Sequence, residues 1–250
     1  MSNIDARERL IAALDLPGVG EARRKVEELE GVVSFFKIGL TLQLAPGVER
    51  LIQDLIRGGK RVFLDYKYYD IPETVKTAVS RAVDLGVSFL TVHGSTPVIE
   101  GAVKGRGSSD LKLFAVTVLT SMDKGDLAEL GYRDLSVEEL VLFRARKALE
   151  AGCDGVIASG REARQVKELA MGEGGSRLLV VTPGIRPDGY AEDDQKRRTT
   201  PAGAIVAGAD YLVIGRPIVG AADSREAAER ILAEMKEAFG KKPRAMVAED

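Results

Sequence analysis

The chain has 250 residues, and its 36 basic and 38 acidic side chains leave a formal net charge of −2. This balance argues against a broad nucleic-acid-binding surface, and no apolar run is long enough for a membrane-spanning helix. The single cysteine, Cys153, cannot form an internal disulfide, and segment 1–9 is too polar for a signal peptide, so we expect a cytoplasmic protein.

The first half of the chain alternates short apolar runs with segments of helical periodicity. The apolar runs, which predict buried strands, are residues 10–14, 32–38, 61–64 and 89–92. The predicted helices are residues 21–30, 47–57 and 74–85. A polar turn or a glycine separates most of these segments, as expected for short connections.

The second half repeats the same rhythm. Its predicted strands are residues 111–119, 155–158, 177–181 and 211–214. Its predicted helices are residues 136–150, 161–170, 200–207 and 224–239, and residues 123–135 form a polar connection. Ser136 and Glu139 have the spacing of a capping box, which places a helix start there.

Eight continuous apolar runs alternating with helices predict parallel strands that are buried on both faces. Gly86, Gly152 and Gly208 each close a helix and lead into a strand, which is a weak internal repeat. We therefore predict an α/β protein with a single (β/α)8 TIM barrel domain over residues 1–250. Within it, residues 1–8 are an N-terminal extension and residues 240–250 a polar tail. A doubly wound sheet is the alternative, but no G-x-G-x-x-G follows the first strand.

Polar side chains gather where the predicted strands end. They are Asp15, Lys37, Asp65, Lys67, His93, Thr120, Ser121, Thr182 and Arg216. In a TIM barrel the active site lies at the C-terminal ends of the strands. This clustering indicates an enzyme whose site is at that end of the barrel.

The segment 63–75 carries the most concentrated chemistry. Asp65 and Lys67 are two residues apart, so on a strand they share a face, and Asp70 follows before Pro72 ends the strand. A solvated strand end with an ordinary salt bridge is the structural alternative. A lysine flanked by carboxylates stays protonated, so Lys67 suits a general acid better than a Schiff-base amine.

A phosphate site is predicted after the last strand. Gly215 lets the backbone approach an anion, and Arg216 offers several donors. The connection 182–200 is long enough to be a lid, although it could also be a disordered insertion. Within it, Gln195 precedes three basic residues that could form a plain solvated face. His93 and Cys153 are more simply interpreted as structural residues.

The order and combination of several short motifs resemble the orotidine 5′-phosphate decarboxylase family over residues 10–235. These motifs are Ala13-Leu14-Asp15, Phe36-Lys37-Ile38-Gly39, Asp65-x-Lys67-x-x-Asp70-Ile71-Pro72-x-Thr74, Leu119-Thr120-Ser121, Thr182-Pro183-Gly184-Ile185-Arg186, Gln195 and Gly215-Arg216. The resemblance implies conversion of orotidine 5′-monophosphate to UMP and carbon dioxide in de novo pyrimidine synthesis, with no metal or organic cofactor.

The resemblance also assigns roles to the residues. Lys67 would protonate C6 of the pyrimidine, Asp65 would lie near the substrate carboxylate, and Lys37 and Asp70 would complete an alternating charge array. Asp70 and Thr74 would enter the site from the neighbouring subunit of a homodimer. The remaining substrate-binding residues would be Asp15 with Lys37 at the ribose, Thr120 and Ser121 at the base, Pro183 in a closing loop, Ile71 beside Asp70, and Arg186, Gln195, Gly215 and Arg216 at the phosphate.

The sequence departs from the family pattern at Tyr66, Tyr68 and Tyr69, which affects packing and dimer contacts rather than the charge array. Two other readings remain. A related barrel family shares Asp-x-Lys-x-x-Asp but acts on sugar phosphates with magnesium, and Lys37 would repel that cation. The second alternative is a non-catalytic regulator that binds a nucleotide. The presence of all four charged residues, Lys37, Asp65, Lys67 and Asp70, argues against it.

Overall fold

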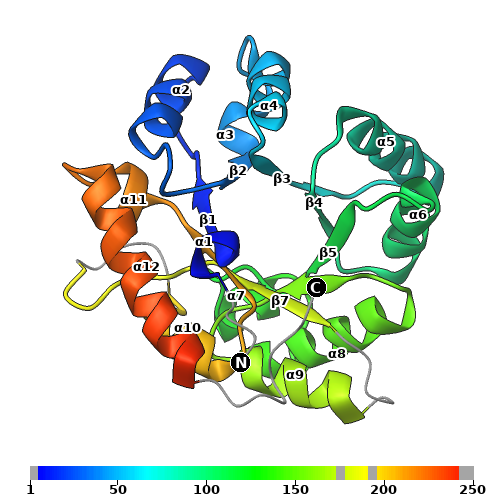
Figure 1. The fold of residues 1–250 in the computed structure, drawn as a ribbon. Coiled ribbons are helices and arrows are strands. Elements are labelled where there is room, and N and C mark those ends of the chain that lie inside the picture. Colours follow the sequence, from blue (N-terminus) through cyan, green and yellow to red (C-terminus); the bar gives the residue numbers. More distant parts are fainter. Residues whose placement is uncertain (1–4, 173–177, 191–195, 242–250) are drawn as a thin grey trace.

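The computed structural model describes residues 5–172, 178–190 and 196–241. These residues contain a closed barrel of parallel strands in the order β1 to β8, with β1 pairing β8 to close it. The strands lie at the centre and the helices surround them (Figure 1). The predicted (β/α)8 fold class is therefore confirmed. The strands are β1 (Leu10–Ala13), β2 (Phe35–Gly39), β3 (Arg61–Tyr68), β4 (Phe89–His93), β5 (Lys112–Val116), β6 (Gly155–Ile157), β7 (Leu179–Thr182) and β8 (Tyr211–Ile214).

Most helices lie in the connections between consecutive strands. The helices are α1 (Ala6–Arg9), α2 (Val19–Glu28), α3 (Leu40–Gln43), α4 (Val48–Arg57), α5 (Pro72–Leu85), α6 (Thr96–Arg106), α7 (Lys124–Glu129), α8 (Val137–Glu150), α9 (Ala163–Gly172), α10 (Pro201–Ala207), α11 (Arg216–Val219) and α12 (Ser224–Lys241). Of these, α1 precedes β1, while α11 and α12 follow β8. The predicted capping box is present, with Ser136 accepting from the Glu139 backbone and Glu139 accepting from the Ser136 backbone. In the part of the chain that the structure describes, no helix combines the length and the apolar character that crossing a bilayer requires.

Helix α6 is the main element that the sequence pattern did not predict. Its glycines, which disfavour an isolated helix, allow it to pack closely on α5. A Cβ at Gly101 would lie 2.4 Å from the carbonyl oxygen of Pro72, and one at Gly105 would lie 2.3 Å from that of Lys76. The first turns of α5, which begins two residues after Asp70, thus pack against α6. The two helices lie side by side in Figure 1.

Side chains alternate between the barrel interior and the layer of helices. The interior holds an aromatic layer of Phe35, Phe63, Phe89, Phe114 and Tyr211, all nearly inaccessible to solvent. Ring centroids are 4.8 Å apart for Phe35 and Phe89, and 4.6 Å apart for Phe89 and Phe114. This layer forms an aromatic floor beneath the C-terminal ends of the strands.

Candidate active site

A row of alternating charges stands directly on the aromatic floor. Lys37 and Asp65 each follow an inward-facing phenylalanine by two residues, so strand alternation points them inward. The Lys37 ammonium lies 2.9 Å from Asp15 Oδ1 and 3.4 Å from Asp65 Oδ2. The Lys67 ammonium lies 2.9 Å from Asp65 Oδ1. The row therefore runs Asp15, Lys37, Asp65, Lys67 along the ends of three adjacent strands.

The interior of this row is more buried than its ends. The side chains of Lys37 and Asp65 are 7% and 16% exposed, whereas Lys67 is 32% and Asp15 46% exposed. Burial alone would raise the pKa of Asp65. The positive charges of Lys37 and Lys67, with hydrogen bonds from Lys67 and Thr91, outweigh that effect and hold its pKa below the usual value. Asp65 is therefore a carboxylate at neutral pH.

Strand β3 carries a bulge at the charged motif. Leu64 pairs with Leu90 and Tyr68 pairs with Val92, so Asp65, Tyr66 and Lys67 lie opposite the single residue Thr91. Lys67 has a φ of 50°, the one positive value among the described non-glycine residues. Such a backbone costs about 1–3 kcal/mol and is typical of functional sites. The sequence predicted that Asp65 and Lys67 would meet by simple alternation, but a bulge brings them together.

Thr91 belongs to this cluster and was not predicted. It is fully buried, its hydroxyl accepts a hydrogen bond from the Lys67 backbone N–H at 2.9 Å, and it donates to Asp65 Oδ1 at 3.0 Å. The sequence did contain an indication. Thr91 follows Phe89 by two residues, between the apolar residues Leu90 and Val92, which places a hydroxyl on the inner face.

Gly39 leaves the space in which Lys37 and Asp15 meet. A Cβ at this position would lie 2.7 Å from the Lys37 ammonium nitrogen and 2.9 Å from Asp15 Oδ1. Both distances are shorter than any carbon contact allows. Any larger residue would therefore displace the first half of the charged row.

A cavity of about 330 Å³ opens beside the row. Of the predicted site residues, it is lined by Lys37, Asp65, Lys67, Thr120, Ser121 and Pro183. The rest of its lining is mostly apolar: Leu40, Phe63, Val116, Val118, Leu119, Ile157 and Val213. Its size is within the range of small-molecule sites, with charge concentrated on one side. An ammonium between carboxylates can deliver a proton where negative charge develops in such a cavity.

Three of the residues predicted for a phosphate, Arg186, Gly215 and Arg216, are not part of the lining of this cavity. A Cβ at Gly215 would be 3.9 Å from Asp15 Oδ2, which places the end of β8 next to the charged row. Arg216 is exposed and begins α11. Arg186 is buried, donates to the carbonyl oxygen of Ile185 at 2.8 Å, and lies over the Tyr190 ring. Gln195 lies outside the described residues.

Asp70, Ile71 and Thr74 face outward. The Asp70 carboxylate accepts a hydrogen bond from the Ile71 backbone N–H at 2.7 Å, and all three residues are exposed. Across the described ranges, no ion pair joins Asp70 to the charged row of its own barrel. Two large apolar side chains beside Asp70, Tyr69 and Ile71, are 69% and 67% exposed.

The basic run after Gln195 is not a plain solvated face. Arg197 is buried, pairs with Glu162 at 2.9 Å, and donates to the carbonyl oxygens of Val118 and Leu119. Lys196 is exposed and bonds Asp123 at 2.7 Å, which lowers the pKa of Asp123 to about 2. The bonds of Arg197 to the two carbonyl oxygens and the pair of Lys196 with Asp123 join the connection after β7 to the segment after β5, which carries Thr120 and Ser121.

The structural interpretation of His93 and Cys153 agrees with their surroundings. His93 stacks on Tyr69 with ring centroids 4.2 Å apart, and burial together with the charge of Arg144 lowers its pKa. Burial raises the pKa of the Cys153 thiol to about 12, so it is not a nucleophile at neutral pH. Among the described residues, neither forms a hydrogen bond or an ion pair with the charged row.

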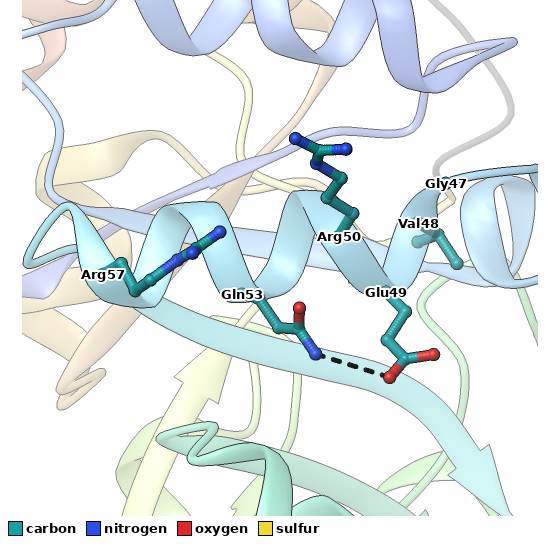
Figure 2. A pocket seen from close by; sticks show the side chains of 6 residues that line it. All are labelled: Gly47, Val48, Glu49, Arg50, Gln53 and Arg57. Carbon is teal, nitrogen blue, oxygen red and sulfur yellow. Dashed lines mark hydrogen bonds between the residues drawn. The ribbon is translucent and has the colours of Figure 1, made fainter.

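A second hollow, drawn in Figure 2, has no row of alternating charges. It lies on the outer side of α4, where Glu49, Arg50, Gln53 and Arg57 are all exposed. Its one drawn hydrogen bond joins Gln53 to Glu49 at 3.4 Å. Over residues 5–172, 178–190 and 196–241, no three His, Cys, Asp or Glu side chains form a group that could hold a metal ion.

Comparisons with known proteins agree on one family. Residues 8–231 match the model of the orotidine 5′-phosphate decarboxylase / HUMPS family. The chain is 53% identical over 234 residues to orotidine 5′-phosphate decarboxylase of Nitrobacter winogradskyi, covering 94% of this chain and 95% of that protein. It is 49% identical over 237 residues to the enzyme of the same name from Methylococcus capsulatus, covering 94% and 95%.

The fold gives the same result. The crystal structure of orotidine 5′-phosphate decarboxylase from Lactobacillus acidophilus superimposes with a TM-score of 0.77 at 34% identity, covering 90% of this chain and 98% of that one. An uncharacterised conserved protein from Geobacillus kaustophilus gives a TM-score of 0.76 at 32% identity, covering 90% and 99%.

Proposed function

Because the chain belongs to the orotidine 5′-phosphate decarboxylase family and is a carboxy-lyase, we propose that it converts orotidine 5′-monophosphate to UMP and carbon dioxide with Lys67 as the proton donor. The observation that carries this proposal is the row of alternating charges beside the cavity. The reaction is the decarboxylation step of de novo pyrimidine synthesis. It uses no metal and no organic cofactor.

The charged row supplies the chemistry. Asp65 lies near the substrate carboxylate, and its fixed negative charge disfavours that anion before the bond breaks. The bond between C6 and the carboxyl carbon then breaks, carbon dioxide leaves, and the electron pair stays on C6. The Lys67 ammonium stabilises this pair and transfers its proton to form the C6–H bond. Lys67 is partly exposed, so the neutral amine can regain a proton from solvent.

The cavity and its rim bind the rest of the nucleotide. Thr120, Ser121 and Pro183 contact the base region, and Asp15 with Lys37 binds the ribose hydroxyls. Arg186, Gln195, Gly215 and Arg216 serve the phosphate. The proximity of Gly215 to Asp15 supports this order, because ribose and phosphate are adjacent in the substrate.

The proposal includes a homodimer in which each barrel completes the other's site. Asp70, Ile71 and Thr74 enter the neighbouring site, where Asp70 extends the charge array. Their exposure, together with that of the apolar Tyr69, supports an interface on this side of the barrel. A cytoplasmic location is part of the same proposal, and the free, buried Cys153 is compatible with it.

The direct test follows the loss of orotidylate absorbance after addition of the purified protein in the presence of EDTA. We expect turnover that is unchanged by chelation. Turnover that is lost on chelation and restored by Mg²⁺ would favour the sugar-phosphate chemistry of the related barrels. Nucleotide binding without turnover would favour a regulator.

A further inference from the structure

We propose that Thr91 is a positioning residue for the decarboxylation, because its one hydroxyl fixes both the Asp65 carboxylate and the Lys67 backbone. This inference rests on the proposed function of Asp65 and Lys67. Thr91 does not line the cavity, so it acts through these two residues and has no contact with substrate.

The bulge creates the need for such a residue. Three residues of β3 face Thr91 alone, so the regular ladder of backbone hydrogen bonds is interrupted between Leu64 and Tyr68. A buried backbone N–H without a partner is costly. The Thr91 hydroxyl accepts from the Lys67 N–H at 2.9 Å and thereby replaces a ladder bond. This bond holds Lys67 in its positive-φ conformation.

The Thr91 hydroxyl accepts one hydrogen bond and donates one. Its oxygen accepts from the Lys67 N–H, and its proton is donated to Asp65 Oδ1 at 3.0 Å. Oδ1 also accepts from the Lys67 ammonium at 2.9 Å, which leaves Oδ2 toward Lys37. Each carboxylate oxygen then has its own partners, and Asp65 is held in one orientation.

Packing alone does not explain a threonine here. Valine has nearly the same shape and a high strand propensity, and the neighbouring interior is aromatic. A buried hydroxyl in such surroundings costs free energy unless it is hydrogen-bonded. Thr91 is therefore suited to its two bonds rather than to filling space.

The test compares Thr91→Val, which keeps the shape, with Thr91→Ser, which keeps the hydroxyl. Loss of a hydrogen bond to a charged group should lower kcat of Thr91→Val by about 10- to 100-fold. KM should stay within about threefold, because the lost bonds do not touch substrate. Thr91→Ser should recover kcat to within about threefold of wild type.

A carboxyl titration gives a readout that does not depend on activity. Asp65 is faced by Lys37 from β2, Lys67 from β3 and Thr91 from β4, with Asp15, two residues after β1, beyond Lys37. The Thr91 bond favours the ionised form, so its loss should raise the pKa of Asp65. A ¹³C NMR titration of the Asp65 carboxyl carbon measures this shift, and the acid limb of the kcat profile should move to higher pH with it.

Thr117→Val is the matched control. Thr117 is also buried and at a strand end, but its hydroxyl donates only to the carbonyl oxygen of Ile157. This variant should leave kcat and the Asp65 titration unchanged, even if its thermal midpoint falls as far as that of Thr91→Val. If Thr91→Val does not fold, comparing Thr91→Ala, which lacks the hydroxyl, with Thr91→Ser, which keeps it, gives the same test.

The inference is overturned if the hydroxyl-free variants keep the wild-type kcat and Asp65 titration, or if Thr91→Ser is as impaired as they are. A wild-type protein that is inactive on orotidylate refutes the proposed function instead. Even then, an unchanged Asp65 titration in Thr91→Val would refute the positioning role, and a raised pKa would support it.

Discussion

Lys67→Ala and Asp70→Ala should each be inactive alone and should regain activity when their chains are mixed. Asp70 is exposed and bonds only its own neighbour Ile71 in the described structure, whereas Lys67 lies in the charged row. If Asp70 serves the neighbouring barrel, one site of a mixed dimer has both defects. The other site then has neither defect and is complete.

The size of the recovery follows from random pairing. An equal mixture of the two chains gives about half mixed dimers, and each mixed dimer has one complete site of two. We therefore expect about a quarter of the wild-type activity per site. If Asp70 served its own barrel, every site would keep one defect and no activity would return.

The assay is orotidylate turnover after the two variants are unfolded and refolded together, compared with each refolded alone. Asp65→Ala mixed with Lys67→Ala is the matched control. Asp65 bonds Lys67 within one barrel at 2.9 Å, so every site of that mixture stays defective. No recovery with Asp70→Ala, with mixed dimers verified by native mass spectrometry, would refute the shared site.

Three further outcomes are expected. Arg216→Ala should raise KM for the nucleotide by about 10- to 100-fold, and far less for the dephosphorylated nucleoside; equal effects on both would remove Arg216 from the phosphate site. Gly39→Ala should lower kcat/KM by about 10- to 100-fold with little change in thermal midpoint, because its Cβ would displace Lys37; wild-type kinetics would contradict this. Lys37→Met removes a positive charge that lowers the pKa of Asp65, so the acid limb of its pH–rate profile should move to higher pH, and an unmoved limb would argue against this coupling.

The pKa direction of Asp65 also predicts how stability depends on pH. A carboxyl whose pKa is lower in the folded state contributes stability that is present above its unfolded value of about 3.9 and is lost as pH falls through the lower folded value. In wild type this contribution should persist through the neutral range and disappear only in strong acid.

The barrel could be predicted because its strands are continuous apolar runs, and this pattern needs no knowledge of tertiary contacts. Helix α6 was missed because its glycines lower helix propensity, and only the close contacts of Gly101 with Pro72 and of Gly105 with Lys76 explain them. The sequence predicted by strand alternation that Asp65 and Lys67 share a face. It could not predict the bulge, because alternation does not show where the pairing register between β3 and β4 shifts.

Arg197 illustrates a different limit. In the sequence it stands in a basic run with Lys196 and Arg198, which is the usual appearance of a solvated face. Its burial depends on Glu162, which comes 35 positions earlier by numbering and from another connection of the barrel. Such a pairing is set by the fold as a whole. Thr91 was missed for the same reason, since its role depends on a neighbouring strand.

The most direct test of the central claim is the kcat of Lys67→Ala on orotidine 5′-monophosphate. General acid catalysis alone is worth about 10²–10⁴-fold, and Lys67 also balances the charge of Asp65, so we expect at least that loss. UMP binding and the thermal midpoint should stay close to wild type. Lys60→Ala, which removes an ammonium paired with Glu30 outside the charged row, should keep full activity. A Lys67→Ala enzyme within about threefold of the wild-type kcat would contradict the assignment of Lys67 as the proton donor.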